Sequence, residues 1–434
     1  MKIKLVIFWF RRDLRLEDNI GLFKALSSQF PVLPIFIFDK NILDRLENKW
    51  DRRVDYIHQS LSYLNNQLKI QNSSLVSFYG DPLAVFKTLS EKYSIQEVFC
   101  NRDYEPQAIK RDTIIYEFFN SKGISFKALK DQVIFDKNDI LKKDETPYTV
   151  FTPYSKRWKE KLASESIFSY DFKNDNFFKL PFSELLTLAD IGFEKTEFKF
   201  VEPTLDASII DDYDQFRDFP ALEKTTQLGT ALRFGTISIR KCVAYALNHN
   251  QTWLSELIWR EFFMQILYHF PEVVKQPFKF KYSFIKWRND EAEFELWCKG
   301  KTGYPLVDAG MRQLNATGFM HNRVRMVVAS FLCKHLLIDW SWGEAYFAEH
   351  LNDYDLSANN GNWQWAAGSG CDAAPYFRVF NPIIQLEKFD KGLEYIKKWL
   401  PDFGTEDYPK PIVDHVFARE RALKAYAEAL NEIR

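Results

Sequence analysis

Residues 4–10 read KLVIFWF, residues 32–38 read VLPIFIF, residues 75–80 read LVSFYG, and residues 98–100 read VFC. Each run is short and rich in Val, Ile, Leu or Phe, which is typical of a strand buried on both faces. Amphipathic stretches such as RRVDYIHQSLSYLNNQL (52–68) lie between them. Short apolar strands that alternate with helices predict an α/β domain with a doubly wound parallel sheet. We expect a ligand of such a sheet at the carboxyl ends of its strands.

The rest of the chain differs in character from this first region. Residues 159–200 mix Ser, Asp, Lys and Phe without a sustained period, which indicates a connector. Stretches such as WLSELIWREFFMQILYHF (253–270) and NRVRMVVASFLCKHLLI (322–338) keep helical periodicity, and β-like runs are almost absent beyond residue 205. The predicted organisation is an α/β domain over 1–130, an interdomain connector over 131–204, and an all-helical domain over 205–434.

Composition and charge exclude several classes of protein. The chain of 434 residues has 58 Lys and Arg against 59 Asp and Glu, so its overall charge does not favour nucleic-acid binding, and only a local basic patch would. The five cysteines are far apart and form no CxxC, and the seven histidines form no HExxH, so we predict neither a disulfide framework nor a metal site. These features fit a reducing, cytoplasmic setting.

The sequence predicts neither a membrane segment nor a standard nucleotide-binding motif. The first apolar run, Leu5–Phe10, is too short for a signal peptide or a membrane span, so we expect no membrane association. The tripeptide GKT (300–302) lacks the glycine of a phosphate-binding loop, because Glu295 stands at that position. GxGxxG is also absent, so a dinucleotide would not be held as in a Rossmann fold.

The segment SELIWREFF (255–263) places Glu256, Trp259, Arg260 and Phe263 on one face of a helix. A tryptophan between an acid and a base can stack on a nucleobase while the carboxylate accepts from ring N–H groups. The alternative is an amphipathic helix whose Glu and Arg are merely solvated.

The segment MHNRVRM (320–326) carries a second polar set. His321 and Arg325 lie one turn apart, as do Asn322 and Met326. Phosphate contacts from Arg323 and amide hydrogen bonds from Asn322 are chemically natural, although a polar helix edge remains the alternative.

The segment LNDYDLSANNGNWQWAAGSGCDAAPYFRVFNP (351–382) is the least ordinary one. Among small residues it carries Asp353, Asp355, Asn359, Asn360, Trp363 and Trp365. Ala and Gly permit a close approach of the backbone to a ligand, so we interpret this segment as part of a binding site.

These three segments, together with GKTGYPLVDAGMRQLNATG (300–318), resemble the flavin-domain signature of the DNA photolyase and cryptochrome family. IFWFRRDLRLEDN (7–19) and YTVFTPYSKRW (148–158) match the family as well, so the resemblance covers nearly the whole chain.

Within the family, MHNRVRM resembles the class I photolyases that repair cyclobutane pyrimidine dimers. The (6-4) photolyases usually have a second histidine at Asn322. Plant cryptochromes usually have Asp at Asn359 and lack the tryptophan at Trp259.

The resemblance implies light-driven repair of cyclobutane pyrimidine dimers in DNA. Non-covalent FAD in the helical domain, reduced and excited by light, would donate an electron to the flipped-out dimer, whose ring opens before the electron returns. A dimer is poorly stacked and poorly paired, so flipping it costs less than flipping a normal base. The expected partner is dimer-containing DNA and the expected state a monomer. The alternatives are a cryptochrome-type blue-light photoreceptor or a (6-4) photolyase.

The resemblance also implies roles for individual residues. The FAD phosphates would be held by Tyr213, Thr225, Thr226, Gln227, Leu228 and Gly229, and the isoalloxazine and ribityl side by Arg325, Asp353, Tyr354, Asp355 and Asn359. The dimer and the DNA would be contacted by Glu256, Trp259, Arg260, Asn322, Arg323, Met326 and Trp365, with Arg217 and Gln385 nearer the strand. Trp363, Trp340 and Trp287 match the electron-transfer chain, and Glu256 and Asn359 are counted with them as catalytic.

Two departures from the family pattern stand out. Gly229 replaces a common serine, which removes one hydroxyl contact to FAD. Gln107 and Ala108 replace the Asn-Glu pair of the folate-binding relatives, so we expect no folate antenna and leave the antenna pigment unassigned.

Overall fold

A computed structural model of the chain describes residues 2–170 and 176–431. Its contacts form two compact units, each described by itself below. The first unit comprises Met1–Asp139, Glu160–Leu205 and Gln227–Asn248, and the second comprises Ile140–Lys159, Asp206–Thr226 and His249–Arg434. Part of the predicted connector, residues 171–175, lies outside the described residues. The functional domain boundaries at 130 and 204 stay a prediction, since these units reflect packing alone.

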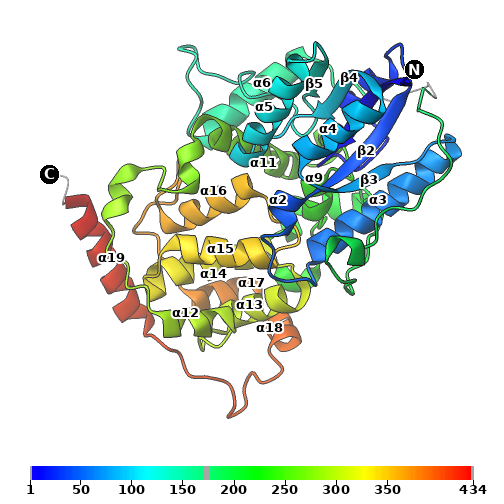
Figure 1. Cartoon of the computed structure of the whole chain (residues 1–434). Coiled ribbons are helices and arrows are strands. Elements are labelled where there is room, and N and C mark those ends of the chain that lie inside the picture. Colours follow the sequence, from blue (N-terminus) through cyan, green and yellow to red (C-terminus); the bar gives the residue numbers. More distant parts are fainter. Residues whose placement is uncertain (1, 171–175, 432–434) are drawn as a thin grey trace. The chain divides into compact units, whose positions relative to one another are not determined.

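The first unit is built on a five-stranded parallel sheet in the order β3-β2-β1-β4-β5 (Figure 1). Its strands are β1 (Lys4–Phe10), β2 (Val32–Asp39), β3 (Val76–Gly80), β4 (Ser94–Asn101) and β5 (Ser125–Leu129). This topology confirms the predicted doubly wound α/β architecture. We did not predict β5, because this edge strand, SFKAL, is only partly buried and lacks a long apolar run.

The two faces of the sheet are both covered, as the apolar runs predict. Along β1, Val6, Phe8 and Phe10 belong to one hydrophobic cluster. The alternate residues Leu5, Ile7 and Trp9 belong to another. The helices of this unit are α1 (Ile20–Leu26), α2 (Lys40–Leu43), α3 (Arg52–Ile70), α4 (Pro82–Lys92), α5 (Pro106–Asn120), α9 (Gly229–Phe234) and α10 (Ile239–His249), with a 3₁₀ turn at η1 (Ala189–Ile191).

Side-chain caps start four of these helices. Asn19, Asp39, Asp51 and Asp81 each accept a hydrogen bond from a backbone N–H in the first turn of α1, α2, α3 and α4, respectively. Such caps satisfy N–H groups that have no partner within the helix. These four side chains therefore help to determine where their helices begin.

Buried charges attach α10 to the segments that follow β1 and β5. Arg240 contacts Asp131 at 2.9 Å and Asp18 at 3.0 Å, and Arg15 contacts Asp131 at 2.8 Å. The two guanidinium groups lower the pKa of Asp131 against the opposing effect of burial. A buried network of this kind is stable only when each charge has a partner, so it fixes the position of residues 227–248.

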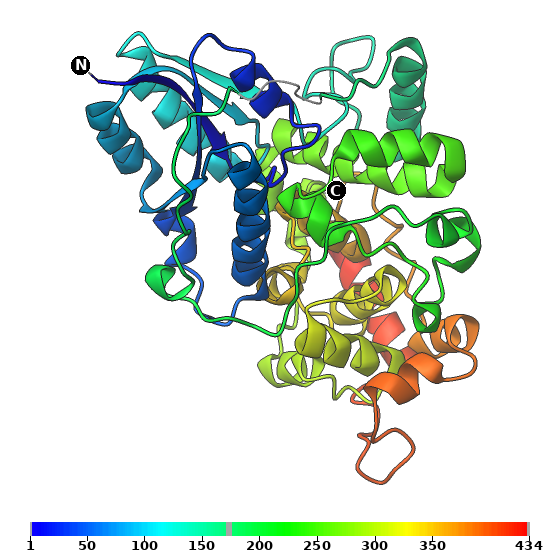
Figure 2. The same ribbon diagram turned by 90° about the vertical axis from the view of Figure 1, so that its right-hand side faces the viewer.

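The second unit is helical. It contains α7 (Ala207–Ile210), α8 (Tyr213–Phe216), α11 (Gln251–His269), α12 (Glu291–Cys298), α13 (Pro305–Thr317), α14 (Asn322–Ser330), α15 (Trp340–His350), α16 (Leu356–Ala367), α17 (Pro382–Phe389), α18 (Glu394–Trp399) and α19 (His415–Asn431). Helix α6 (Phe151–Ser164) begins in this unit. Short 3₁₀ turns lie at η2 (Pro220–Leu222), η3 (Pro271–Val274) and η4 (Phe280–Phe284), and a π-helix at η5 (Phe331–Leu336). Among the described residues beyond 205 there is no strand, which confirms the all-helical prediction (Figure 2).

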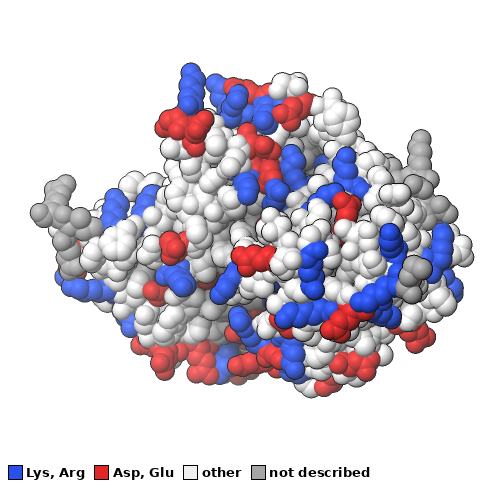
Figure 3. Space-filling view, turned by 45° about the horizontal axis from the view of Figure 1, so that its top comes forward, with Lys and Arg blue, Asp and Glu red and all other residues white. Residues whose placement is uncertain are grey.

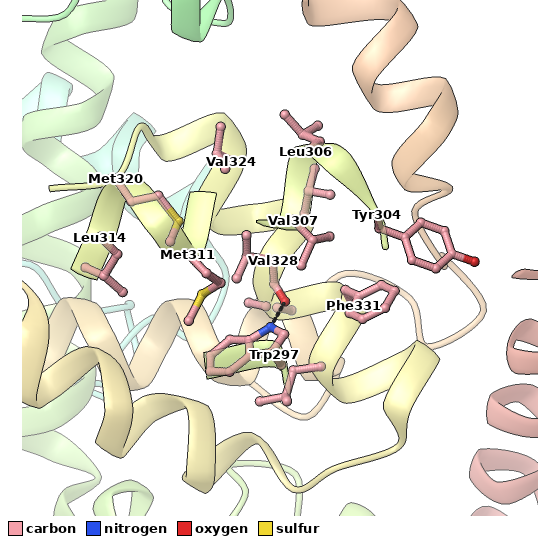
Figure 4. Close-up of a cluster of buried hydrophobic side chains, with 14 of the residues drawn as sticks. Trp297, Tyr304, Leu306, Val307, Met311, Leu314, Met320, Val324, Val328 and Phe331 are labelled. Carbon is pink, nitrogen blue, oxygen red and sulfur yellow. Dashed lines mark hydrogen bonds between the residues drawn. The ribbon is translucent and has the colours of Figure 1, made fainter. Parts of the chain in front are cut away.

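The core of this unit lies between α12, α13 and α14 (Figure 4). The Trp297 indole N–H donates to the Val328 carbonyl at 3.3 Å, which satisfies the one polar atom of a fully buried ring. A Cβ at Gly310 would lie 2.4 Å from Val324, so this glycine lets α13 and α14 approach closely. No helix among the described residues is long and apolar enough to cross a membrane.

Candidate functional site

A cavity of about 90 Å³ lies between α14, α15 and α16 of the helical unit. Its lining brings together nine residues singled out from the sequence: Asn322, Arg325, Met326, Asp353, Tyr354, Asp355, Asn359, Trp363 and Trp365. Residues of two predicted roles, cofactor binding and lesion contact, therefore share one cavity.

Arg325 is the fixed cation of this cavity. Its Nε donates to the Met320 carbonyl at 2.7 Å, and its Nη2 donates to Asp353 at 2.9 Å. Asp355 caps α16 by accepting from the backbone N–H groups of Ser357 and Ala358, at 3.1 and 3.2 Å. The polar wall is thus organised by hydrogen bonds of the chain itself.

Asn359 is a buried residue of the cavity wall. Its Nδ2 donates to the Glu344 carbonyl at 2.9 Å. The neighbouring Asn360 donates to the Glu344 carboxyl group at 3.4 Å. Burial raises the pKa of Glu344 to about 7, which makes the neutral acid accessible near neutral pH.

The chemistry of the cavity lining suits a planar heteroaromatic group such as the isoalloxazine of FAD. Trp363, Phe347 and Trp365 provide apolar surface, while Arg325 and Asn359 provide hydrogen-bonding groups. A flavin ring needs both, because its faces are apolar and its edge carries donors and acceptors.

The predicted phosphate-binding segment is divided between the two units. Tyr213, Thr225 and Thr226 belong to the helical unit, and residues 227–229 to the α/β unit. Gln227 adopts a left-handed conformation with φ +50°, and Leu228 is the N-cap residue of α9. The phosphate contacts of these residues stay a prediction.

The aromatic residues predicted to contact the lesion lie beside a second, smaller cavity. It is too narrow to hold a water molecule and is lined by Trp259 of α11, Trp365 of α16, and residues 370–373. Phe151 stacks on Trp259 with ring centroids 3.6 Å apart and planes at 6°. The Phe151 backbone N–H in turn donates to Asp372 at 3.0 Å. Trp365 lines both cavities, so the aromatic surface is continuous with the cofactor cavity.

Two of the predicted DNA-contacting arginines form ion pairs with carboxylates. Arg217 donates to Glu256 at 2.5 Å, and Arg323 donates to Asp218 at 2.7 Å. The alternative of a freely solvated helix edge therefore does not hold for Glu256. Arg260 on α11 and Gln385 on α17 are both half-buried. Sequence reasoning missed Asp218, whose only signal is its place directly after Arg217.

The three predicted electron-transfer tryptophans belong to one hydrophobic cluster. Trp363 and Trp340 are part of its buried core, 2% and 5% exposed, and the half-buried Trp287 packs against it. A Cβ at Gly343 would lie 2.1 Å from the Trp363 ring, so only glycine permits this packing of α15 on α16. The electron-transfer role of the three tryptophans stays a prediction.

At the carboxyl ends of the strands of the α/β unit, charged groups pair with each other. Arg11 contacts Asp112 at 2.5 Å, and the guanidinium groups of Arg11 and Arg111 lie 4.9 and 4.8 Å from the centre of the Trp9 ring. Gln107 and Ala108 lie in the first turn of α5. This arrangement assigns no antenna pigment. No cluster of His, Cys, Asp and Glu in the described part of the chain could hold a metal ion.

Comparison with known proteins gives consistent matches. Residues 6–170 match a model described as DNA photolyase, and residues 253–406 match one described as FAD binding domain of DNA photolyase. The deoxyribodipyrimidine photo-lyase of a Synechococcus species is 37% identical, with 98% of this chain and 97% of the relative covered.

Two solved structures are similar over nearly the whole chain. A class III photolyase from Agrobacterium tumefaciens has a TM-score of 0.86 at 33% identity, covering 99% of this chain and 98% of that one. A cryptochrome from Synechocystis has a TM-score of 0.84 at 25% identity, covering 98% and 99%. With a fold, cavity and sequence that agree, the chain belongs to the DNA photolyase family.

Proposed function

We propose that this chain uses light to repair cyclobutane pyrimidine dimers in DNA with bound FAD. The observation that carries the proposal is the single cavity lined both by the predicted flavin residues Arg325 and Asn359 and by the predicted lesion residue Asn322. A cofactor and a flipped dimer placed there would be neighbours. The curated relatives, which are named deoxyribodipyrimidine photo-lyase, support the same activity.

When bound, reduced FAD would supply light-driven electron donation to the dimer. The protein provides placement and electrostatics. Arg325, held by Asp353, presents a guanidinium group to the cavity, and Trp363 forms an apolar wall. Asn322 and Trp365 present an amide and a ring to the entering base, and Trp259 extends that aromatic surface.

A photoreceptor is the second candidate, because a cryptochrome is among the similar structures. Asn359 and Trp259, where plant cryptochromes usually differ, favour repair. Asn322, where (6-4) photolyases usually have histidine, favours the cyclobutane dimer over the (6-4) product. Membership of class I stays part of the proposal, since one similar structure is described as class III.

The test is illumination of the reduced, FAD-loaded protein with an oligonucleotide that contains one thymine dimer. The expected result is restored thymines in the light and none in the dark. A parallel oligonucleotide with a (6-4) product should stay unchanged. A flavin-loaded protein that binds neither lesion and restores no thymines would favour the photoreceptor.

We further propose a monomer that works in the cytoplasm. All five cysteines are free thiols, which fits a reducing compartment. Light scattering of the purified protein, with and without DNA, tests the monomeric state.

A further inference from the structure

Four charged side chains of the helical unit form a continuous row of alternating sign. Glu256 on α11 contacts Arg217 at 2.5 Å, and the Arg217 Nε lies 3.9 Å from Asp218. Asp218 then contacts Arg323 on α14 at 2.7 Å. Two negative and two positive groups cancel, so both arginines are neutralised. The face shown in Figure 3 also carries charges of both signs side by side, without a large area of one sign.

Arg323 has a support that does not depend on Asp218. Its guanidinium group lies 4.4 Å from the centre of the Phe389 ring, and its side chain is only 18% exposed. Its Nε is buried without a hydrogen-bond partner. Arg323 would therefore keep its place if Asp218 lost its charge, but it would then carry an uncompensated positive charge.

We propose that Asp218 is a specificity-determining residue, which keeps Arg323 neutralised until a dimer engages Glu256. When the dimer takes the Glu256 carboxylate, Arg217 turns from Glu256 to Asp218. Asp218 then releases Arg323, which binds a DNA phosphate. The inference rests on the proposed function, because it requires Glu256 to contact the dimer.

This exchange would couple recognition of the lesion to binding of the backbone. Every DNA duplex offers phosphates, and contacts to them are independent of sequence and strongly salt-dependent. An undamaged duplex offers no flipped base to Glu256, so it reaches Arg323 only by breaking the ion pair with Asp218. A dimer instead binds Glu256 at the other end of the row, and Arg217 then takes the place of Arg323 as the partner of Asp218. The chain thus trades general DNA affinity for selectivity.

The decisive variant is Asp218→Asn, which keeps the size of the side chain and an acceptor for Arg323 but removes the charge. Affinity for undamaged duplex should rise about three- to tenfold, and its dependence on salt should steepen by about 0.9 for the one freed cation. Affinity for dimer-containing duplex should change less than twofold.

Asp212→Asn is the matched control: it makes the same charge change in the same segment, but Asp212 is exposed and lies outside the row. Its affinities should follow those of the wild type.

A low flavin content of Asp218→Asn would show that this variant folds poorly. A second variant, Glu256→Gln, then tests the proposal. Glu256→Gln should also free Arg323 by letting Arg217 turn to Asp218, so its affinity for undamaged duplex should rise. In the Asp218→Asn background the same change should not alter Arg323 but should free Arg217 as well, so the salt dependence should steepen by a second step of about 0.9.

Equal increases for damaged and undamaged duplex, or an unchanged salt dependence, would overturn the proposal. A failure of the proposed function is distinguishable, because the wild type would then show no preference for dimer-containing duplex.

Discussion

The ring of Phe151 lies flat on the ring of Trp259, with centroids 3.6 Å apart and planes at 6°. Phe262 and Phe263 contact the same indole, with centroids 5.6 and 5.5 Å away. Trp259 is therefore held in one orientation before any base arrives, and a pre-oriented ring loses little entropy on stacking.

Replacing Phe151 with Ala should weaken the binding of dimer-containing DNA. A stacked aromatic pair is worth about 0.5–1.5 kcal/mol, and losing it would free the Trp259 ring. We expect affinity to fall about three- to tenfold, with normal flavin content. Phe151→Tyr keeps the ring and should bind like the wild type. Wild-type affinity in Phe151→Ala would show that the stack does not orient Trp259.

Replacing Trp363 with Phe should abolish photoreduction of oxidised FAD but leave repair by chemically reduced protein largely intact. The tryptophan chain refills the flavin and takes no part in ring opening. Trp399→Phe is the control, because Trp399 packs against the same cluster but lies outside the predicted chain. Absorbance during illumination and thymine recovery are measured in parallel. Equal loss of both activities would mean that Trp363 is structural.

Replacing Glu256 with Ala should lower dimer affinity or repair yield roughly ten- to a hundredfold. A hydrogen bond to a charged group is worth about 1.5–3 kcal/mol. Glu256→Gln should fall between, since it keeps one acceptor, and flavin content should stay normal in both. Affinity and quantum yield are compared at matched salt, because phosphate contacts depend on it. Unchanged binding and repair in Glu256→Ala would move the lesion contacts to Asn322 and Arg323.

Replacing Asp353 with Ala should lower the flavin content of the purified protein, which we expect to carry non-covalent FAD in the wild type. Arg325 would lose the partner that orients it in the cavity. Asp402→Ala, which breaks the comparable ion pair with Arg312 at 2.5 Å outside the cavity lining, is the control and should retain FAD. Absorbance spectra before and after reconstitution give the measurement. A wild type that stays colourless would contradict the cofactor assignment.

Replacing Glu344 with Gln should remove a pH dependence of stability. Burial raises the pKa of Glu344 to about 7 from an ordinary value of 4.5, so the folded protein binds the proton more tightly. The protonated Glu344 carboxyl group therefore stabilises the folded protein by up to about 3 kcal/mol below about pH 4.5. This stabilisation is lost as the pH rises through 7. Relative to the wild type, Glu344→Gln should gain thermal stability between pH 5 and pH 8 at constant flavin content. Parallel pH profiles for the two proteins would contradict this.

Much of the site could be predicted from the sequence because its residues occur in long segments. Asn322, Arg325 and Met326 come from one helix, and Asp353 and Asn359 from another segment, and the structure places all five around one cavity. The strand β5 and the residue Asp218 could not be predicted. A half-exposed edge strand has no continuous apolar run, and an acid beside an arginine has no distinctive spacing.

By itself the sequence determined the alternating elements of the α/β unit, the helical character of the chain beyond residue 205, and the segments that line the cavity. Periodicity and capping chemistry are local, so they can be read along the chain. Only the tertiary structure decided which side chains meet. Glu256 lies 39 residues from Arg217, and Arg323 lies 105 residues from Asp218. Yet Arg217 and Asp218, which are adjacent in the chain, form ion pairs with both of these distant residues. Such pairings depend on how α8, α11 and α14 pack, and packing is set by contacts between residues far apart in the chain.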